Sequence, residues 1–287
     1  MLGLNPGHTL EPDYKLSVEN VYLQTASSMI LALGNLDILC CVFHPKTMKT
    51  LPSWVPDWQT QVIVRRTLCS SPGQHRQYLE DRPLIGISFS EDLRALVVNG
   101  RLIDTVAAVS NTFPENGSTF ICGAEWEDFA REASRLGGWP FPDTYWRTIL
   151  AGTNTIAPKS DFELRSMYDS WKNLRNRSND VTAHYEPLTN LPDENEKGSE
   201  FGGLMGDICV GRRLFKTENH SLGLGPSETH VGDVVCFLAS NPQPFVLREA
   251  DDFYELVGEG FVQGFMHEAD PSVRSKNPQD AREFIIR

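Results

Sequence analysis

Short β-rich runs separated by turn-forming residues fill the C-terminal part of this chain. Between residues 211 and 266, runs of Val, Leu, Phe and Tyr are broken by Gly, Asn and Pro, as at Asn241-Pro242. This spacing is typical of a meander or a small barrel. We therefore expect the C-terminal strands to lie within residues 207–267.

A second group of strands is predicted over residues 83–110. Asn99-Gly100 lies inside it and has the composition of a two-residue hairpin. The apolar run continues through this dipeptide, so one long bent strand with a glycine bulge is equally compatible. Neither group has enough strands to bury itself. We expect the two groups to form a single antiparallel β-barrel or strongly curved sheet in one α+β domain spanning residues 1–287.

Helical periodicity surrounds these strands. Ser17 is a predicted N-cap and Gly34 a predicted end of a helix within residues 11–60. The residues predicted to share the inner face of that helix are Val18, Val21, Tyr22, Thr25, Met29 and Leu33. Residues 36–43 fit either a strand or a short helix.

A helical insertion is predicted over residues 124–176, packed outside the sheet. Within it, Ser160 and Glu163 form a capping-box pattern. The acidic, proline-containing stretch 178–203 is predicted to be a mobile loop.

Composition narrows the possible partners and the compartment. The formal net charge is -12 and the pI is about 5.0, which argues against binding of nucleic acid or of an anionic membrane. The apolar stretch 29–43 is too short and too polar for membrane insertion. The six cysteines show no CxxC spacing, so we expect reduced thiols in a cytoplasmic protein.

The sequence LPSWVPDW at residues 51–58 is stiffened by two prolines. Trp54 and Trp58 could fill the core, with Asp57 capping backbone N–H groups. Alternatively, their rings could form a pocket wall that binds substrate, with Asp57 taking part in chemistry. Both interpretations stay open at the level of sequence.

Arg212 and Arg213 are neighbours on a predicted strand and should face opposite sides of the sheet. A buried arginine needs an acidic partner, for which Asp57, Glu255 and Glu259 are candidates. Glu259 lies between two glycines, where it could act as a general acid or base or could accept structural hydrogen bonds.

The candidate site follows from these arguments. Its predicted catalytic residues are Glu259, Asp57 and Arg213, and its predicted substrate-binding residues are Trp54, Trp58, Arg212 and Tyr254. The histidines lack metal-ligand spacing, and no phosphate-binding or dinucleotide loop is present, so we expect neither a metal nor a cofactor.

Three motifs together resemble a known family. They are the DYKLSVENVY segment at residues 13–22, the LPSWVPDW box and the strand-rich segment 211–266. In this order they are similar to the C-terminal region of fungal heterokaryon-incompatibility (HET) proteins. In that family the HET domain lies N-terminal to these motifs, and Met1 falls where it would already have ended. The resemblance implies a structural or regulatory part, and it transfers no catalytic residue.

Three functions are compatible with this reading. The preferred one is a stand-alone module that encloses a small apolar molecule between its strands, extended to a cofactor-free cyclase, pericyclase or isomerase of fungal terpenoid or polyketide metabolism. The alternatives are a non-enzymatic interaction module, with a HET-domain protein as partner, and a truncated gene product.

Overall fold

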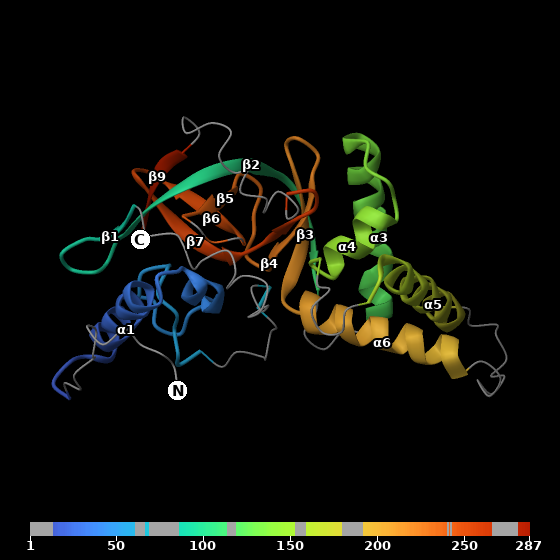
Figure 1. Cartoon of the computed structure of the whole chain (residues 1–287), viewed down its shortest axis with the longest axis horizontal. Coiled ribbons are helices and arrows are strands. Elements are labelled where there is room, and N and C mark those ends of the chain that lie inside the picture. Colours follow the sequence, from blue (N-terminus) through green and yellow to red (C-terminus); the bar gives the residue numbers. More distant parts are fainter. Residues whose placement is uncertain are drawn as a thin grey trace.

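The fold was analysed in a computed structural model. It describes residues 14–60, 67–68, 86–113, 119–152, 159–179, 192–239, 241, 243–265 and 281–287. A large sheet occupies one part of the molecule, with the N-terminal helix below it and the other α-helices gathered beside it (Figure 1). The α+β prediction is confirmed.

The helices carry the caps that the sequence predicts. The helical elements are α1 (Val18–Leu33), the 3₁₀-helix η1 (Asp37–Cys41), α3 (Thr119–Gly137), α4 (Asp143–Ile149), α5 (Asp161–Asn179) and α6 (Pro192–Cys209). The Ser17 hydroxyl accepts the Asn20 N–H, and Gly34 ends α1 in the left-handed region. Ser160 and Glu163 bond reciprocally before α5. None of the helices in the described ranges is long and apolar enough to cross a bilayer.

The buried face of α1 differs from the predicted one. Leu23, Ala26 and Ile30 are buried against the sheet. Three of the predicted inner residues, Val18, Val21 and Leu33, are exposed. Apolar residues are spread around most of this helix, so periodicity alone does not define one face. Packing against the neighbouring elements determines which face of α1 is buried.

The predicted mobile loop over residues 178–203 is wrong over its second half, where α6 begins at Pro192. Proline is tolerated in the first turn of a helix. The following stripe of Phe201, Met205 and Ile208 is fully buried, and Phe201 packs against the rings of Tyr168 and Trp171 on α5. Burial of these apolar side chains thus stabilises a helix whose first turns have a polar sequence. Residues 180–191 lie outside the described part.

The strands form one connected sheet. They are β1 (Ile87–Phe89), β2 (Leu96–Thr112), β3 (Arg212–Thr217), β4 (Leu222–Pro226), β5 (Val234–Leu238), β6 (Pro244–Ala250), β7 (Phe253–Glu259), β8 (Phe261–Val262) and β9 (Ala281–Ile286). Asn99-Gly100 lies inside β2, so the long strand is confirmed and the hairpin is not. At Gly100 a Cβ would approach the Phe237 carbonyl oxygen to 2.5 Å, so this crossing requires glycine.

The hydrogen-bonded pairings return to their starting strand. β2 pairs with β5, β5 with β6, β6 with β7, β7 with β9, and β9 with β2 again. β3, β4 and β8 continue from the other end of β2. The predicted antiparallel arrangement is wrong for one pair, because β7 and β9 run parallel. β9 comes from a C-terminal tail whose Phe284-Ile285-Ile286 run is too short to predict a strand.

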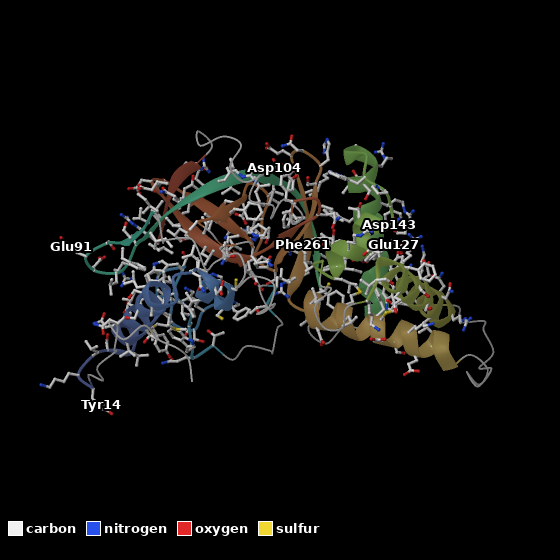
Figure 2. All side chains as sticks on the ribbon, in the orientation of Figure 1. Tyr14, Glu91, Asp104, Glu127, Asp143 and Phe261 are labelled. Carbon is white, nitrogen blue, oxygen red and sulfur yellow. The ribbon has the colours of Figure 1, made fainter. Side chains whose placement is uncertain are left out.

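Both faces of these strands are covered by packed apolar side chains. One face packs against α1, η1 and the 51–58 segment, through residues such as Ile30, Trp54 and Phe245. The opposite face packs Val106, Phe215, Val235, Val246, Val257 and Val262 together. A third cluster joins the helices to β3, β4 and Phe261, which lies where sheet and helices meet (Figure 2).

Replacing Phe201 by alanine tests the assignment of α6. Phe201→Ala should destabilise the protein by about 3–5 kcal/mol, because it leaves a cavity between α5 and α6. The exposed neighbour Ser199→Ala is the matched control and should change stability by less than about 0.5 kcal/mol. Urea unfolding of both variants measures the difference. Equal, small effects would contradict the helix packing described here.

Candidate functional site

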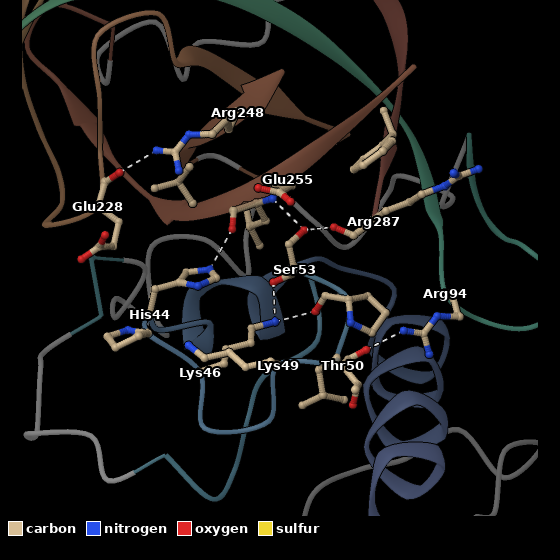
Figure 3. A pocket seen from close by; sticks show the side chains of 16 residues that line it. His44, Lys46, Lys49, Thr50, Ser53, Arg94, Glu228, Arg248, Glu255 and Arg287 are labelled. Carbon is tan, nitrogen blue, oxygen red and sulfur yellow. Dashed lines mark hydrogen bonds between the residues drawn. The ribbon is translucent and has the colours of Figure 1, made fainter. Parts of the chain in front are cut away.

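A pocket of about 520 Å³ lies between residues 44–53 and strand β7 (Figure 3). We call residues 44–58 the box segment. It consists of the tryptophan box at residues 51–58 and the seven residues before it. The pocket is lined by His44, Pro45, Lys46, Lys49, Thr50, Leu51, Pro52, Ser53, Arg94, Glu228, Arg248, Phe253, Glu255, Leu256, Val257 and Arg287. Leu51 and Leu256 of this lining belong to the cluster that packs α1 and the 51–58 segment on the strands, and Val257 belongs to the cluster on the opposite face.

Two side chains of the box segment bind the backbone of β7 at Leu256. His44 Nε2 lies 2.9 Å from the Leu256 carbonyl oxygen, and the Leu256 N–H donates to Ser53 Oγ at 2.8 Å. The Ser53 hydroxyl in turn donates to the main-chain oxygen of Arg287. Burial lowers the pKa of His44, as does the positive charge of Lys46. Because the Leu256 carbonyl oxygen can only accept, Nε2 donates this hydrogen bond.

Lys46 organises the box segment from within. Its buried ammonium donates to the carbonyl oxygens of Pro52, Ser53 (2.8 Å) and Val55 (2.7 Å). These three bonds use all three ammonium donors. Burial lowers the pKa of Lys46 to about 7, and the charge of Asp57 acts in the opposite direction.

Two arginines are anchored on opposite sides of the pocket. Arg94 forms an ion pair with Glu19 at 2.6 Å and donates to the Thr50 carbonyl oxygen. Arg248 donates to the carboxylate of Asp233 at 2.9 and 3.0 Å and to the Glu228 carbonyl oxygen at 2.7 Å. These contacts fix the guanidinium groups and so give the pocket a defined shape.

The tryptophan box occupies mainly structural positions. Trp54 is fully buried and its indole N–H donates to the Arg94 carbonyl oxygen at 3.2 Å. Trp58 is 44% exposed and meets Tyr22 edge to face. Asp57 accepts the Met48 N–H at 2.7 Å and the Gln59 N–H at 3.0 Å. Burial alone would raise the pKa of Asp57, but these hydrogen bonds outweigh it and lower the pKa.

Glu259 is the acidic partner of a buried arginine, as predicted, and that arginine is Arg212. Their side chains are 3% and 4% exposed, and Arg212 Nη2 lies 2.6 Å from Glu259 Oε1. The same oxygen accepts the Leu68 N–H at 2.8 Å, and Arg212 also donates to the Ile208 carbonyl oxygen. Burial raises the pKa of Glu259, and the charge of Arg212 acts against this rise. The pair joins the end of α6 to β7.

The remaining candidates lie apart from Glu259. Arg213 faces the other side of β3 and donates to Thr112 Oγ1 at 2.9 Å and to the Thr229 carbonyl oxygen at 3.1 Å. Tyr254 packs on Phe284. Arg212 and Glu259 line a small space of about 20 Å³ that shares His44, Glu228 and Val257 with the large pocket. The structure thus brings Arg212 and Glu259 together behind the pocket and places the other five candidates outside its lining.

Sequence reasoning missed most of the pocket. Lys46, Lys49, Arg94, Arg248 and Arg287 come from segments far apart along the chain, and no local pattern links them. The one available signal is the position of His44 and Lys46 directly before the proline-stiffened box. In the described ranges, no cluster of three or more His, Cys, Asp or Glu side chains could hold a metal ion.

Residues 139–277 match the family model of the Het-6 beta-barrel domain. This match confirms, over these residues, the predicted resemblance to the C-terminal region of HET proteins. No curated protein and no solved structure matches the chain. Strands β2 and β9, the box segment and Arg94 lie outside the matched range, so the pocket is walled partly by the domain and partly by flanking chain.

Glu259→Gln tests the buried ion pair. The substitution leaves the buried Arg212 without a negative partner and should cost about 3–5 kcal/mol of stability. The double variant Glu259→Gln/Arg212→Met removes both charges and should recover part of that loss. Chemical denaturation measures both. A loss below about 1 kcal/mol in the single variant would show that the pair does not hold α6 to the sheet.

Lys46 should make stability rise with pH above neutrality. Its folded pKa of about 7 lies below its ordinary value of 10.5, so the unfolded chain binds more protons between these two values. The protein should gain about 2 kcal/mol between pH 7 and pH 9 relative to Lys46→Met, in denaturation experiments at each pH. Direct NMR titration of the Lys46 side chain provides the check that needs no variant. A midpoint above pH 10 would contradict the prediction.

Proposed function

We propose that this HET-related chain recognises a small organic molecule in the pocket between the box segment and β7. The observation that carries the proposal is a pocket of about 520 Å³ whose walls are held by hydrogen bonds between remote segments. Sites for small ligands are usually concave, of this size range and largely formed before binding. The contacts of His44 and Ser53 with Leu256 supply that pre-formed shape.

The character of the lining favours recognition over conversion. Lys46 and His44 are the titratable groups with lowered pKa values in the pocket, and backbone carbonyls engage both. Glu259, the predicted general acid or base, is engaged by Arg212. Binding is therefore the proposed function, while a purely apolar metabolite and a cyclase reaction stay predictions from the sequence.

We further propose that the ring of pairings from β2 through β5, β6, β7 and β9 is a small barrel within a single domain. The return of the pairings to β2 supports this. Of the five strands of this ring, only β6 and β7 contribute residues to the lining of the pocket. The ligand would thus be bound beside the strands and not enclosed by them.

The domain match favours a second function, interaction with another protein. A HET-related module can serve an incompatibility pathway without chemistry of its own, and a HET-domain protein stays the predicted partner. Affinity purification with the full chain as bait tests this, and recovery of a HET-domain protein is the expected result. Its absence from replicate purifications in the native host would count against this second function.

Thr50→Trp tests the pocket directly. Thr50 is an exposed lining residue, and an indole there should fill part of the opening without disturbing the core. Fragments that bind the wild-type protein in ligand-observed NMR should lose at least about tenfold in affinity. The control Ser199→Trp places the same ring on the exposed side of α6 and should leave binding unchanged. Fragment affinities that are the same in the wild-type protein and in Thr50→Trp, or the absence of any fragment binding, would overturn the proposal.

A further inference from the structure

We infer that the ligand of this pocket is a small amphipathic organic anion, a molecule with one carboxylate or phosphate group on an apolar body. The inference rests on the proposed function and names the ligand class for the same site. It follows from the placement of charge around the pocket, from the side chains that remain available to bind, and from the apolar part of the lining.

Basic side chains outnumber acidic ones in the pocket lining, against the trend of the whole chain. The chain has 38 acidic and 26 basic residues, a formal net charge of -12. The pocket lining reverses this balance. Its basic residues are Lys46, Lys49, Arg94, Arg248 and Arg287, and its acidic residues are Glu228 and Glu255. Arg94 and Arg248 are paired with Glu19 and Asp233, which lie outside the lining. The positive charge left to attract an anion is therefore mainly that of Lys49 and Arg287.

The two acidic residues of the lining are gathered near Arg248. Glu228 and Glu255 both act electrostatically on this guanidinium, which already holds the carboxylate of Asp233. In Figure 3, Arg248 and Glu228 lie on one side of the pocket, and Arg94 and Arg287 lie on the other. An anionic group should therefore bind away from Arg248.

Lys49 and Arg287 are the cations best suited to bind that group. Lys46, Arg94 and Arg248 are engaged by carbonyl oxygens or carboxylates. Among the described residues, no ion pair is found for Lys49 or Arg287, and both side chains are exposed. Arginine binds carboxylate and phosphate through two parallel hydrogen bonds, and lysine adds a mobile positive charge.

The rest of the lining suits an apolar body. Leu51, Pro52, Phe253 and Val257 line the same pocket, and the Arg287 guanidinium lies 5.3 Å from the centre of the Phe253 ring. An aromatic or aliphatic group can pack on this wall while its charged end meets Arg287. The volume of about 520 Å³ accommodates such a molecule and excludes a large polymer.

A matched ligand series tests the inference by calorimetry on the full chain. The probes are 4-phenylbutyrate, 3-phenylpropyl phosphate, the neutral 4-phenylbutanamide and the cationic 4-phenylbutylamine. At least one anion should bind about tenfold tighter than the amide. Its affinity should also fall as salt is raised from about 0.05 to 0.5 M. The tighter of the two anions identifies carboxylate or phosphate as the preferred group.

Variants locate the charge. Lys49→Gln and Arg287→Gln should each weaken binding of the preferred anion about five- to tenfold and leave the amide unchanged. Lys216→Gln, on β3 outside the lining, is the matched control and should have no effect. Equal or tighter binding of the amide or the amine would overturn this inference and leave the proposed function intact. If neither these four probes nor the fragments bind, the proposed function and the inference fail together.

Discussion

Strand β2 is the element on which the sheet depends, because four other strands pair with it. Its first residues pair with β1 and β9, its middle with β5, and its last residues with β3. Gly100 lies where β9 and β5 pair with opposite edges of the strand, and no other residue would fit there without displacing the Phe237 carbonyl. A strand of this length connects the part of the sheet that contacts α1 with the part that contacts the helices.

The pocket forms where side chains of the box segment make hydrogen bonds to the backbone of β7. β7 pairs with β9 only at Tyr254, so the next backbone groups on that edge are bound by side chains instead of by a strand. The box segment therefore lies across the edge and cannot fill it as evenly as a strand would. Behind it, Arg212 and Glu259 connect the same strand to α6. The pocket wall and the ion pair that joins the helices to the sheet thus share β7.

Local features of the fold could be predicted, and long-range ones could not. The caps at Ser17 and Ser160 depend on neighbouring residues only, so the sequence contains all the information needed to place them. The start of α6 depends on burial of Phe201 against α5, which no local window shows. The acidic partner of a buried arginine could be limited to Asp57, Glu255 and Glu259, because a buried charge needs a residue of opposite charge beside it. The cations of the pocket could not be predicted, because only the fold brings Lys49 and Arg287, 238 residues apart, into the lining of one pocket.

His44 and Ser53 also cover part of the open edge of strand β7. An open strand edge is a template on which a second chain can add, and such addition leads to aggregates. By occupying both backbone groups of Leu256, these two side chains remove the template from the middle of β7. The segment that walls the pocket thereby also covers the strand edge, so a substitution of His44 or Ser53 would alter both the pocket wall and the cover of this edge.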